Sequence, residues 1–453
     1  MKKILYILFL ILQFASFCFA KNEHEDKTEY LNLNFWSKFQ DEILIDNLKT
    51  AFENNLDLKI AAYKVKESEK IVKLALGEEL PQIDFEPLIG QTFSSSDEHF
   101  GSLVINSYNQ SRFLLPLYVS YEIDIWGKNR LKTKSKTQSL KMIQQDEKST
   151  YILLSSAIGA DYFNLIKIDK TLSIEKKLLS LNEELLRLIE NKEKTGLATK
   201  DDVLAIKENV VKIKAKINNY ETKKETLENQ LSYLLGDKLF KEVKRSDFDS
   251  ITMPFSAPET LESQIILNRP DVVLKSENII RANYDARIAK RELLPSFTIT
   301  GTFGFNGYNN LKGIFGSHTG IAEVFVAPRW NIFDGARRFN FMKLKQIELS
   351  RAKEEYEKTI LASLKEVNDS LAIFKNEERN YDLSSDVYDI QSEKLKLKSN
   401  NAKYGLSSKA DYITYEIAQN IALEKLINDK VNYIISSIGL YKSTGGVDFS
   451  ENL

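Results

Sequence analysis

The chain has 453 residues with 63 Lys and Arg against 64 Asp and Glu, and this balance excludes a strongly basic nucleic-acid-binding protein. It holds only 8 Pro and 18 Gly, too few for an ordinary multidomain α/β enzyme, which predicts long uninterrupted helices. The scattered His24, His99 and His318 and the single Cys18 form no ligand cluster or nucleophile–base pair. We therefore expect no enzyme activity, no cofactor and no metal.

Residues 1–20 have the pattern of a secretory signal peptide. Lys2 and Lys3 precede an apolar run, and the small residues Cys18 and Ala20 place the cleavage site after Ala20. An alternative makes Cys18 a lipidated first residue, but the bulky Phe17 before it does not suit a lipid-modification signal. The rest of the chain contains no apolar run long enough for a transmembrane helix.

Two copies of one unit make up the mature chain. The sequence around Asp57 matches that around Asp271 at an offset of 214 residues, and residues 194–200 match residues 403–409 at an offset of 209. Such self-similarity predicts a structural repeat. We expect a first repeat at 21–240, a linker at 241–257, a second repeat at 258–445 and a tail at 446–453.

Each repeat is predicted to hold a helical hairpin. No proline occurs between Pro116 and Pro254 or after Pro328, and proline breaks helix interiors. Apolar residues recur there at helical spacing, and Gly196 and Gly405 mark the turns between a long helix and a returning one. The single apolar stripe of each helix is expected to pack in an antiparallel coiled coil. The predicted helices span 131–193, 200–235, 270–294, 339–401 and 409–440.

Two strands are predicted before each long helix, because apolar residues there alternate with mostly polar ones. The apolar stripes of the helices pack against one another and are not available to the strands. Lipid is therefore expected to cover the apolar strand faces. Four strands cannot close a barrel, and open edges cannot face lipid, so the chain is expected to oligomerise in a number left open. The predicted strands span 83–94, 111–126, 296–307 and 321–333.

Four motifs in chain order resemble the TolC/OprM type of outer-membrane efflux factor. Residues 121–128 (Tyr-Glu-Ile-Asp-Ile-Trp-Gly-Lys) and 331–338 (Asn-Ile-Phe-Asp-Gly-Ala-Arg-Arg) are similar to its strand-to-helix signature. Residues 268–271, with the helix that runs on to 296, resemble its central motif, and 405–416 its tip hairpin. The resemblance implies a mostly α fold with a membrane β-barrel. A homotrimer would close twelve strands into one barrel, and its helices would form a tunnel.

The resemblance also implies a passive exit duct in the cell outer membrane. Its partners would be a periplasmic adaptor protein, an inner-membrane pump and outer-membrane lipid, with no nucleic acid. The alternative is a periplasmic structural coiled-coil protein whose strands form a soluble collar. The sequence leaves open the substrate (drug, metal or protein), the cognate pump, the fate of Cys18 and the resting state of the pore.

The candidate site is the periplasmic tip, where each return helix begins with a capping box, Thr199 to Asp202 and Ser408 to Asp411. Asp411 also matches the family position at which acidic residues ring the entrance, so the resemblance implies a gating role beside the capping role, with capping alone as the alternative. Thr414 stands where many relatives carry a second Asp. Further gate candidates, as cross-hairpin ion pairs, are Lys200, Asp202, Lys409 and Glu416.

Two residues at each strand-to-helix junction have simpler expected roles. Gly127 and Gly335 should permit the sharp change from strand to helix. Trp126 and Trp330, near strand ends, should lie at a membrane interface, where amphipathic rings are favoured.

Overall fold

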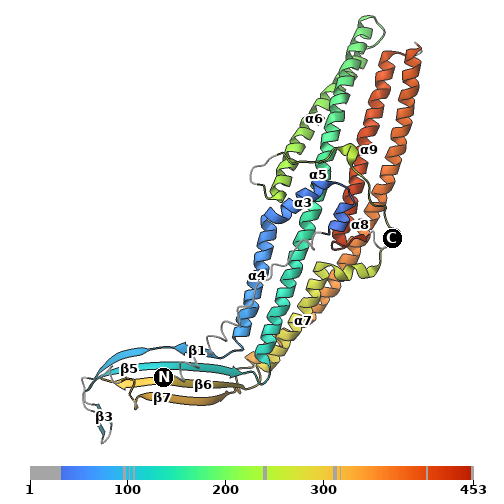
Figure 1. The fold of residues 1–453 in the computed structure, drawn as a ribbon. Helices are drawn as coiled ribbons and strands as arrows, with labels where there is room; N and C mark the ends of the chain where they lie inside the picture. Colours follow the sequence, from blue (N-terminus) through green and yellow to red (C-terminus); the bar gives the residue numbers. More distant parts are fainter. Residues whose placement is uncertain are drawn as a thin grey trace.

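The computed structural model describes residues 32–94, 98–100, 103–105, 108–237, 242–309, 314–316, 318–404 and 407–449. The predicted signal peptide with Cys18 and the predicted turn residue Gly405 lie outside these ranges. The described chain is elongated, with an antiparallel sheet at one end and two helical hairpins at the other (Figure 1).

Helices build most of the described chain. Two long helices, α5 (Lys128–Lys194) and α8 (Arg337–Lys403), run from the sheet to the far end and return as α6 (Lys200–Leu235) and α9 (Lys409–Ser443). The half nearer the sheet also contains α4 (Leu56–Gly77) and α7 (Pro270–Arg291). Shorter elements lie between: α2 (Leu33–Ser37), α3 (Glu42–Asn54), η2 (Phe248–Ser250) and η3 (Ser263–Asn268).

The two halves repeat the same elements at the offsets read from the sequence. Helices α4 and α7 each have 22 residues and begin 214 positions apart, at Leu56 and Pro270. Helices α5 and α8 each have 67 residues and begin 209 positions apart. The predicted two-fold repeat is therefore confirmed, whereas the exact domain bounds stay predictions. Both long helices start before the predicted 131 and 339, because the chain turns into helix directly after the glycine junctions.

The sheet is antiparallel in the order β1, β5, β6, β7, with β2 also paired to β5. Phe85 of β1 lies opposite Leu117, and Leu88 of β2 lies opposite Leu114, so both segments follow one continuous register on β5. Pro87 stands between them and has no backbone N–H to donate, which explains why the predicted strand 83–94 is interrupted. The strands are β1 (Gln82–Phe85), β2 (Leu88–Ser94), β5 (Tyr108–Ile123), β6 (Ser296–Tyr308) and β7 (Gly320–Arg329).

Two expectations about the strands were wrong. Strand β7 ends at Arg329, so the predicted strand 321–333 is too long, and β5 begins and ends three residues before the predicted strand 111–126. A short hairpin of β3 (Glu98–Phe100) and β4 (Leu103–Ile105) also lies between β2 and β5, where no strand was predicted. Beyond the strand ends, Trp126 Nε1 donates to the Pro295 carbonyl (2.7 Å) and Trp330 Nε1 to the Leu293 carbonyl (3.2 Å). Both indoles thus tie the start of a long helix to the α7–β6 connection.

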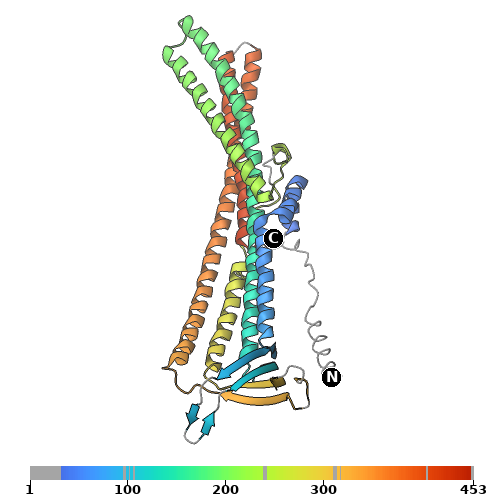
Figure 2. The ribbon, with the colours of Figure 1, turned by 90° about the vertical axis from the view of Figure 1, so that its left-hand side faces the viewer.

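One face of the sheet is apolar across its strands. Leu117 lies opposite Phe303, and Ile299 lies opposite both Tyr121 and Val326, so the apolar sets of neighbouring strands share a face. The other face carries Thr298, Thr300 and Thr302 on β6, among other polar residues. Figures 1 and 2 show the sheet projecting beyond the helices, and Phe85, Val324 and Val326 of the apolar face are each 61% exposed.

The helices lie side by side in the same order as the strands to which they are joined. Near the sheet the order is α4, α5, α7, α8, and toward the far end it is α6, α5, α9, α8. In chain order, α4 leads to β1, β5 leads to α5, α7 leads to β6, and β7 leads to α8. Each helix near the sheet is therefore the direct continuation of one strand. None of the described helices carries an apolar stretch long enough to cross a lipid bilayer.

The largest core lies at mid-height, where α2 packs against α5 and α9. Phe35 and Trp36 are fully buried, and the Phe35 ring stacks on Tyr441 with a centroid separation of 4.2 Å. A Cβ added to Gly159 of α5 would lie 2.6 Å from the Trp36 indole. Glycine at this position therefore lets the indole approach the long helix, which fixes the chain before α4 to the bundle.

Candidate functional site at the hairpin tips

Both return helices begin with a reciprocal capping box. Thr199 N donates to Asp202 Oδ2 (2.8 Å), and Asp202 N donates to Thr199 Oγ1 (3.2 Å). In the second half, Ser408 N donates to Asp411 Oδ2 (3.1 Å) and Asp411 N to Ser408 Oγ (3.2 Å). Hydrogen bonding by the Ser408 side chain and backbone lowers the pKa of the Asp411 carboxyl. Asp411 is thus an exposed, ionised cap, and its gating role stays a prediction.

A ladder of ion pairs joins the two hairpins along the seam between α5 and α9. Lys409 Nζ lies 2.5 Å from Glu184 Oε1, and Lys177 Nζ lies 3.1 Å from Glu416 Oε1. The partners are seven residues apart on each helix, and the sign of the charge alternates, as in the ion pairs that flank coiled-coil seams. Lys409 and Glu416 therefore do make cross-hairpin pairs, with α5 as their partner.

The other gate candidates do not join this ladder. Asp202 is held in its own cap, and Lys200 is exposed beside it. Thr414 donates from Oγ1 to the Ala410 carbonyl (2.9 Å), one turn back in the same helix. Because α9 packs on α5 in this region, the ion pairs described here join Lys409 and Glu416 to α5, and the gating role of Asp202 and Lys200 stays a prediction.

The glycine junctions have left-handed backbones. The φ angles are 69° at Gly127, 67° at Gly335 and 75° at Gly196. Residues with a side chain are strained at such positive φ angles. Gly127 also accepts a hydrogen bond at its carbonyl from Arg291 Nη1 (2.6 Å), which joins the start of α5 to the end of α7. The junction therefore fixes the angle between the sheet and α5.

An ionic cluster around the buried Glu175 lies deeper between the hairpins, and it was not predicted from the sequence. Glu175 of α5 is fully buried, and its Oε1 lies 2.9 Å from Lys216 Nζ of α6. The same ammonium lies 3.8 Å from Glu424 Oε2 of α9, and the Tyr220 hydroxyl donates to Glu424 Oε1 (3.5 Å). Burial, followed by the charge of Glu175, raises the pKa of the Glu424 carboxyl.

A signal for this cluster was present in the sequence. Glu175 stands at helical spacing between Leu172 and Leu179, on the stripe that packs against α6. A carboxylate on an apolar coiled-coil stripe is costly to bury and calls for a partner. The partners themselves lie on other helices and could not be read from local spacing.

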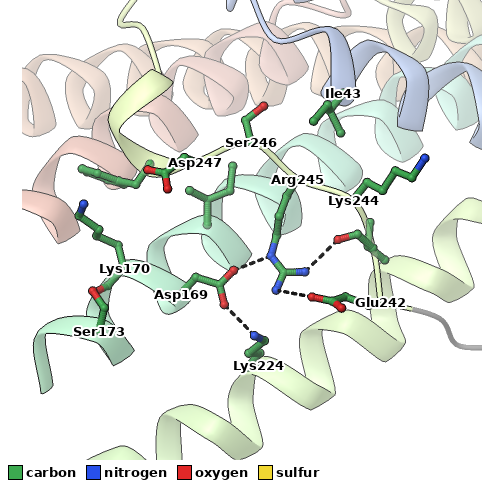
Figure 3. Close-up of a pocket in the computed structure, with 13 residues that line it drawn as sticks. Ile43, Asp169, Lys170, Ser173, Lys224, Glu242, Lys244, Arg245, Ser246 and Asp247 are labelled. Carbon is green, nitrogen blue, oxygen red and sulfur yellow. Dashed lines mark hydrogen bonds and ion pairs between the residues drawn. The ribbon is translucent and has the colours of Figure 1, made fainter. Parts of the chain in front are cut away.

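A cavity of about 830 Å³ at mid-height is bounded by α3, α5, α6 and the segment that follows α6 (Figure 3). Arg245 extends across it, with Nε 2.5 Å from Asp169 Oδ2 (Figure 3). Its Nη1 also lies 2.9 Å from Glu228 Oε1. Burial acts against ionisation of Asp169, yet hydrogen bonds from Arg245 and Lys224 leave the pKa of this carboxyl below its ordinary value. These ion pairs of Arg245 anchor the predicted linker region to α5 and α6. Among the described residues, no group of three or more His, Cys, Asp and Glu is placed to hold a metal ion.

Comparison with family models matches residues 47–237 and 261–446 to the outer membrane efflux protein family, with one segment in each half of the chain. The chain belongs to this family. Its members are efflux channels, not enzymes. The predicted mostly helical fold class, the efflux function and the outer-membrane location are therefore confirmed.

Several named proteins are similar over nearly the whole chain. The solvent efflux pump outer membrane protein SrpC of Pseudomonas putida is 25% identical over 90% of this chain and 86% of its own length. The cation efflux system protein CusC of Escherichia coli K12 is 23% identical over 92% of this chain and 89% of its own. The Campylobacter jejuni CmeC outer membrane channel has a TM-score of 0.79 at 22% identity and covers 92% of this chain and 90% of its own. This structural likeness shows a shared fold.

Proposed function

We propose that the protein is a homotrimeric exit duct, in which three copies close one barrel of twelve strands in the outer membrane. Their helices form a tunnel through the periplasm, and a periplasmic adaptor and an inner-membrane pump deliver the substrate, which leaves passively. The observation that supports this most strongly is that a single chain has two unpaired edges, which run along the whole sheet and helix bundle.

The two edges face opposite ways and continue from sheet to helices. Strand β7 lies at one edge of the sheet and β1 with β2 at the other. Helix α8 follows β7 on its side of the bundle, and α4 precedes β1 on the other. An open strand edge cannot face lipid, because its backbone groups would lack hydrogen-bond partners. Pairing β7 of one copy with the β1–β2 edge of the next resolves this and brings α8 against the neighbour's α4.

Both edge helices carry exposed apolar residues that a neighbouring copy would cover. On α4, Tyr63 is 63% and Leu74 is 72% exposed, and on α8, Ile347 is 67% and Leu361 is 68% exposed. These residues belong to stripes that also include Leu56, Ile60, Ile71, Leu383, Val387 and Ile390. Apolar stripes of this length in water favour burial against a partner helix.

The charges near the sheet also complement each other across the two edges. Arg329 at the end of β7 and Arg337 at the start of α8 are exposed on one edge. Asp84 and Glu86 are exposed on or beside β1 at the other. Opposite charges on the two edges favour a head-to-tail ring over pairing of like edges.

Native mass spectrometry in mild detergent tests the assembly, and we expect a trimer. The same preparation should form ion-conducting pores in planar bilayers, and the protein should fractionate with the outer membrane. A monomer that conducts would overturn the proposed barrel. Recovery in the soluble periplasmic fraction would instead support the structural collar.

A further inference from the structure

The Glu175, Lys216 and Glu424 cluster joins three helices from both hairpins. Glu175 on α5 and Lys216 on α6 belong to the first hairpin, whereas Glu424 on α9 belongs to the second. Any movement that separates the second hairpin from the first must pull Glu424 away from the other two side chains. The cluster lies on the same α5–α9 packing seam as the ladder of ion pairs at the tips.

The cluster has one negative charge more than it can neutralise. Two carboxylates share one ammonium, and Glu175 Oε2 is buried without a hydrogen-bond partner. A proton on Glu424 would remove the excess charge and supply a carboxyl O–H donor beside Glu175. Adjacent buried carboxylates commonly share a proton for this reason. Lys216 is 54% exposed, so the cluster has a route for exchanging protons with solvent.

The fold itself does not require a carboxylate at this position. The second repeat places Ser384 at the offset of 209 residues from Glu175, and Ser384 is also buried. Its hydroxyl donates to the Tyr381 carbonyl (2.9 Å) within its own helix. One half of the chain thus packs the same helix position with a small neutral residue, so the buried charge of Glu175 needs a separate explanation.

We propose that this cluster is a proton-operated latch, which holds the two hairpins together when Glu424 carries a proton and weakens their contact when the proton leaves. The proton comes from the periplasmic solvent and binds a Glu424 carboxylate oxygen, and no other bond changes. The link to pore opening rests on the proposed channel function, whereas the hairpin movement does not.

The sign follows from the two states of Glu424. In the joined hairpins burial and Glu175 raise the pKa of Glu424, and in separated hairpins the carboxyl returns toward its ordinary value of 4.5. Protons therefore bind more tightly to the joined state. The extra stability of the joined state is fully present at pH values below the ordinary pKa of Glu424. It is lost as the pH rises through the raised pKa of the joined state.

Several charged side chains on the elements around the cluster are held in ion pairs of their own. On α9, Lys425 pairs with Asp429 (2.8 Å), and between α5 and α6, Lys176 pairs with Glu221 (3.3 Å). In the segment that includes η2, Asp249 pairs with Lys170 of α5 (2.7 Å). After burial, which acts most strongly on the pKa of Glu424, the side chains that influence it are Glu175 of α5 and Lys216 and Tyr220 of α6.

Pulsed electron paramagnetic resonance can measure the hairpin separation directly. Leu197→Cys and Tyr404→Cys place spin labels at the two tips, where the natural side chains are 78% and 81% exposed. Labelled chains are diluted with unlabelled chains so that each assembly holds one pair. We expect a narrow distance distribution at about pH 5 and a separated population about fivefold larger at about pH 8.

Three variants decide whether the cluster causes this response. Glu424→Gln keeps a neutral hydrogen-bonding group, and its distance distribution should stay narrow at both pH values. Glu175→Ser, which copies the second repeat, should also abolish the pH response. Glu208→Gln removes an exposed carboxylate that pairs within α6 with Lys212, and it should respond like wild type. An unchanged wild-type distribution, or a full response in Glu424→Gln or Glu175→Ser, would overturn the latch. If the trimer conducts ions but the hairpin distance does not respond to pH, only the latch is refuted. If the hairpin distance responds to pH but the protein does not conduct, only the channel function is refuted.

Discussion

Asp411 combines its capping role with the proposed gating role, and a pair of substitutions can separate the two. In the proposed trimer three copies of its exposed carboxylate would meet at the entrance, where they would attract cations and repel one another. We expect Asp411→Ala to raise conductance or weaken block by divalent cations added from the periplasmic side, measured in planar bilayers. The cap itself should weaken as the pH falls through the lowered pKa of Asp411, because protonation removes a hydrogen-bond acceptor for Ser408 N.

Asp202 provides the matched control for this experiment. It occupies the same capping position 209 residues earlier and makes the same reciprocal hydrogen bonds with Thr199. Asp202→Ala should therefore lower the melting temperature as much as Asp411→Ala while it changes conduction less. Equal conduction in both variants and wild type would show that Asp411 is a helix cap only.

The residues of the tips show what local sequence can and cannot reveal. Both capping boxes could be predicted because each depends on a spacing of three residues within one helix start. The ion-pair partners could not, since Lys409 meets Glu184 only after α9 packs on α5. The role of the partly buried Glu424 was missed for the same reason, because its neighbours lie on two other helices.

At the scale of elements, the strand faces make a direct prediction. Phe303 lies on the apolar face opposite Leu117, whereas Thr302 lies on the polar face opposite Glu323. Phe303→Lys should impair membrane insertion, since a charge on the lipid face near the bilayer midplane costs about 2 to 4 kcal/mol. Thr302→Lys should insert normally, because the new ammonium lies opposite the Glu323 carboxylate. Equal insertion and heat stability of the two variants would mean that the faces are assigned wrongly.

The helices and strands that the sequence predicted correctly are those with strong periodicity. Helices α5 and α8 carry long apolar stripes without proline, and β5 and β6 alternate cleanly. The break between β1 and β2 was missed although Pro87 marks it, because an edge strand tolerates proline without losing its register. The small helix α2 was missed because tertiary packing of Trp36 against Gly159, rather than local pattern, holds it in place.

For the whole molecule, the edge stripes predict which surface substitutions disrupt assembly. Leu74→Lys places a charge in the proposed contact between α4 and the neighbour's α8, and should cost about 2 kcal/mol per contact. Leu197→Lys changes a residue of similar exposure, 78% against 72%, at a tip outside that contact. Native mass spectrometry at decreasing protein concentration should show dissociation first for Leu74→Lys. Identical dissociation of the two variants would place the interface elsewhere.

The pairing of β5 with β6 also sets the order in which the chain folds. It joins residues as distant as Arg112 and Tyr308, with the whole first hairpin between them. Helical hairpins form from local contacts and fold fast, whereas strand pairs between distant residues close slowly. The hairpins should thus be complete while the sheet is still open. In the proposed trimer, the final closure of the barrel depends on encounters between chains, so its rate should rise with chain concentration while helix formation stays independent of it.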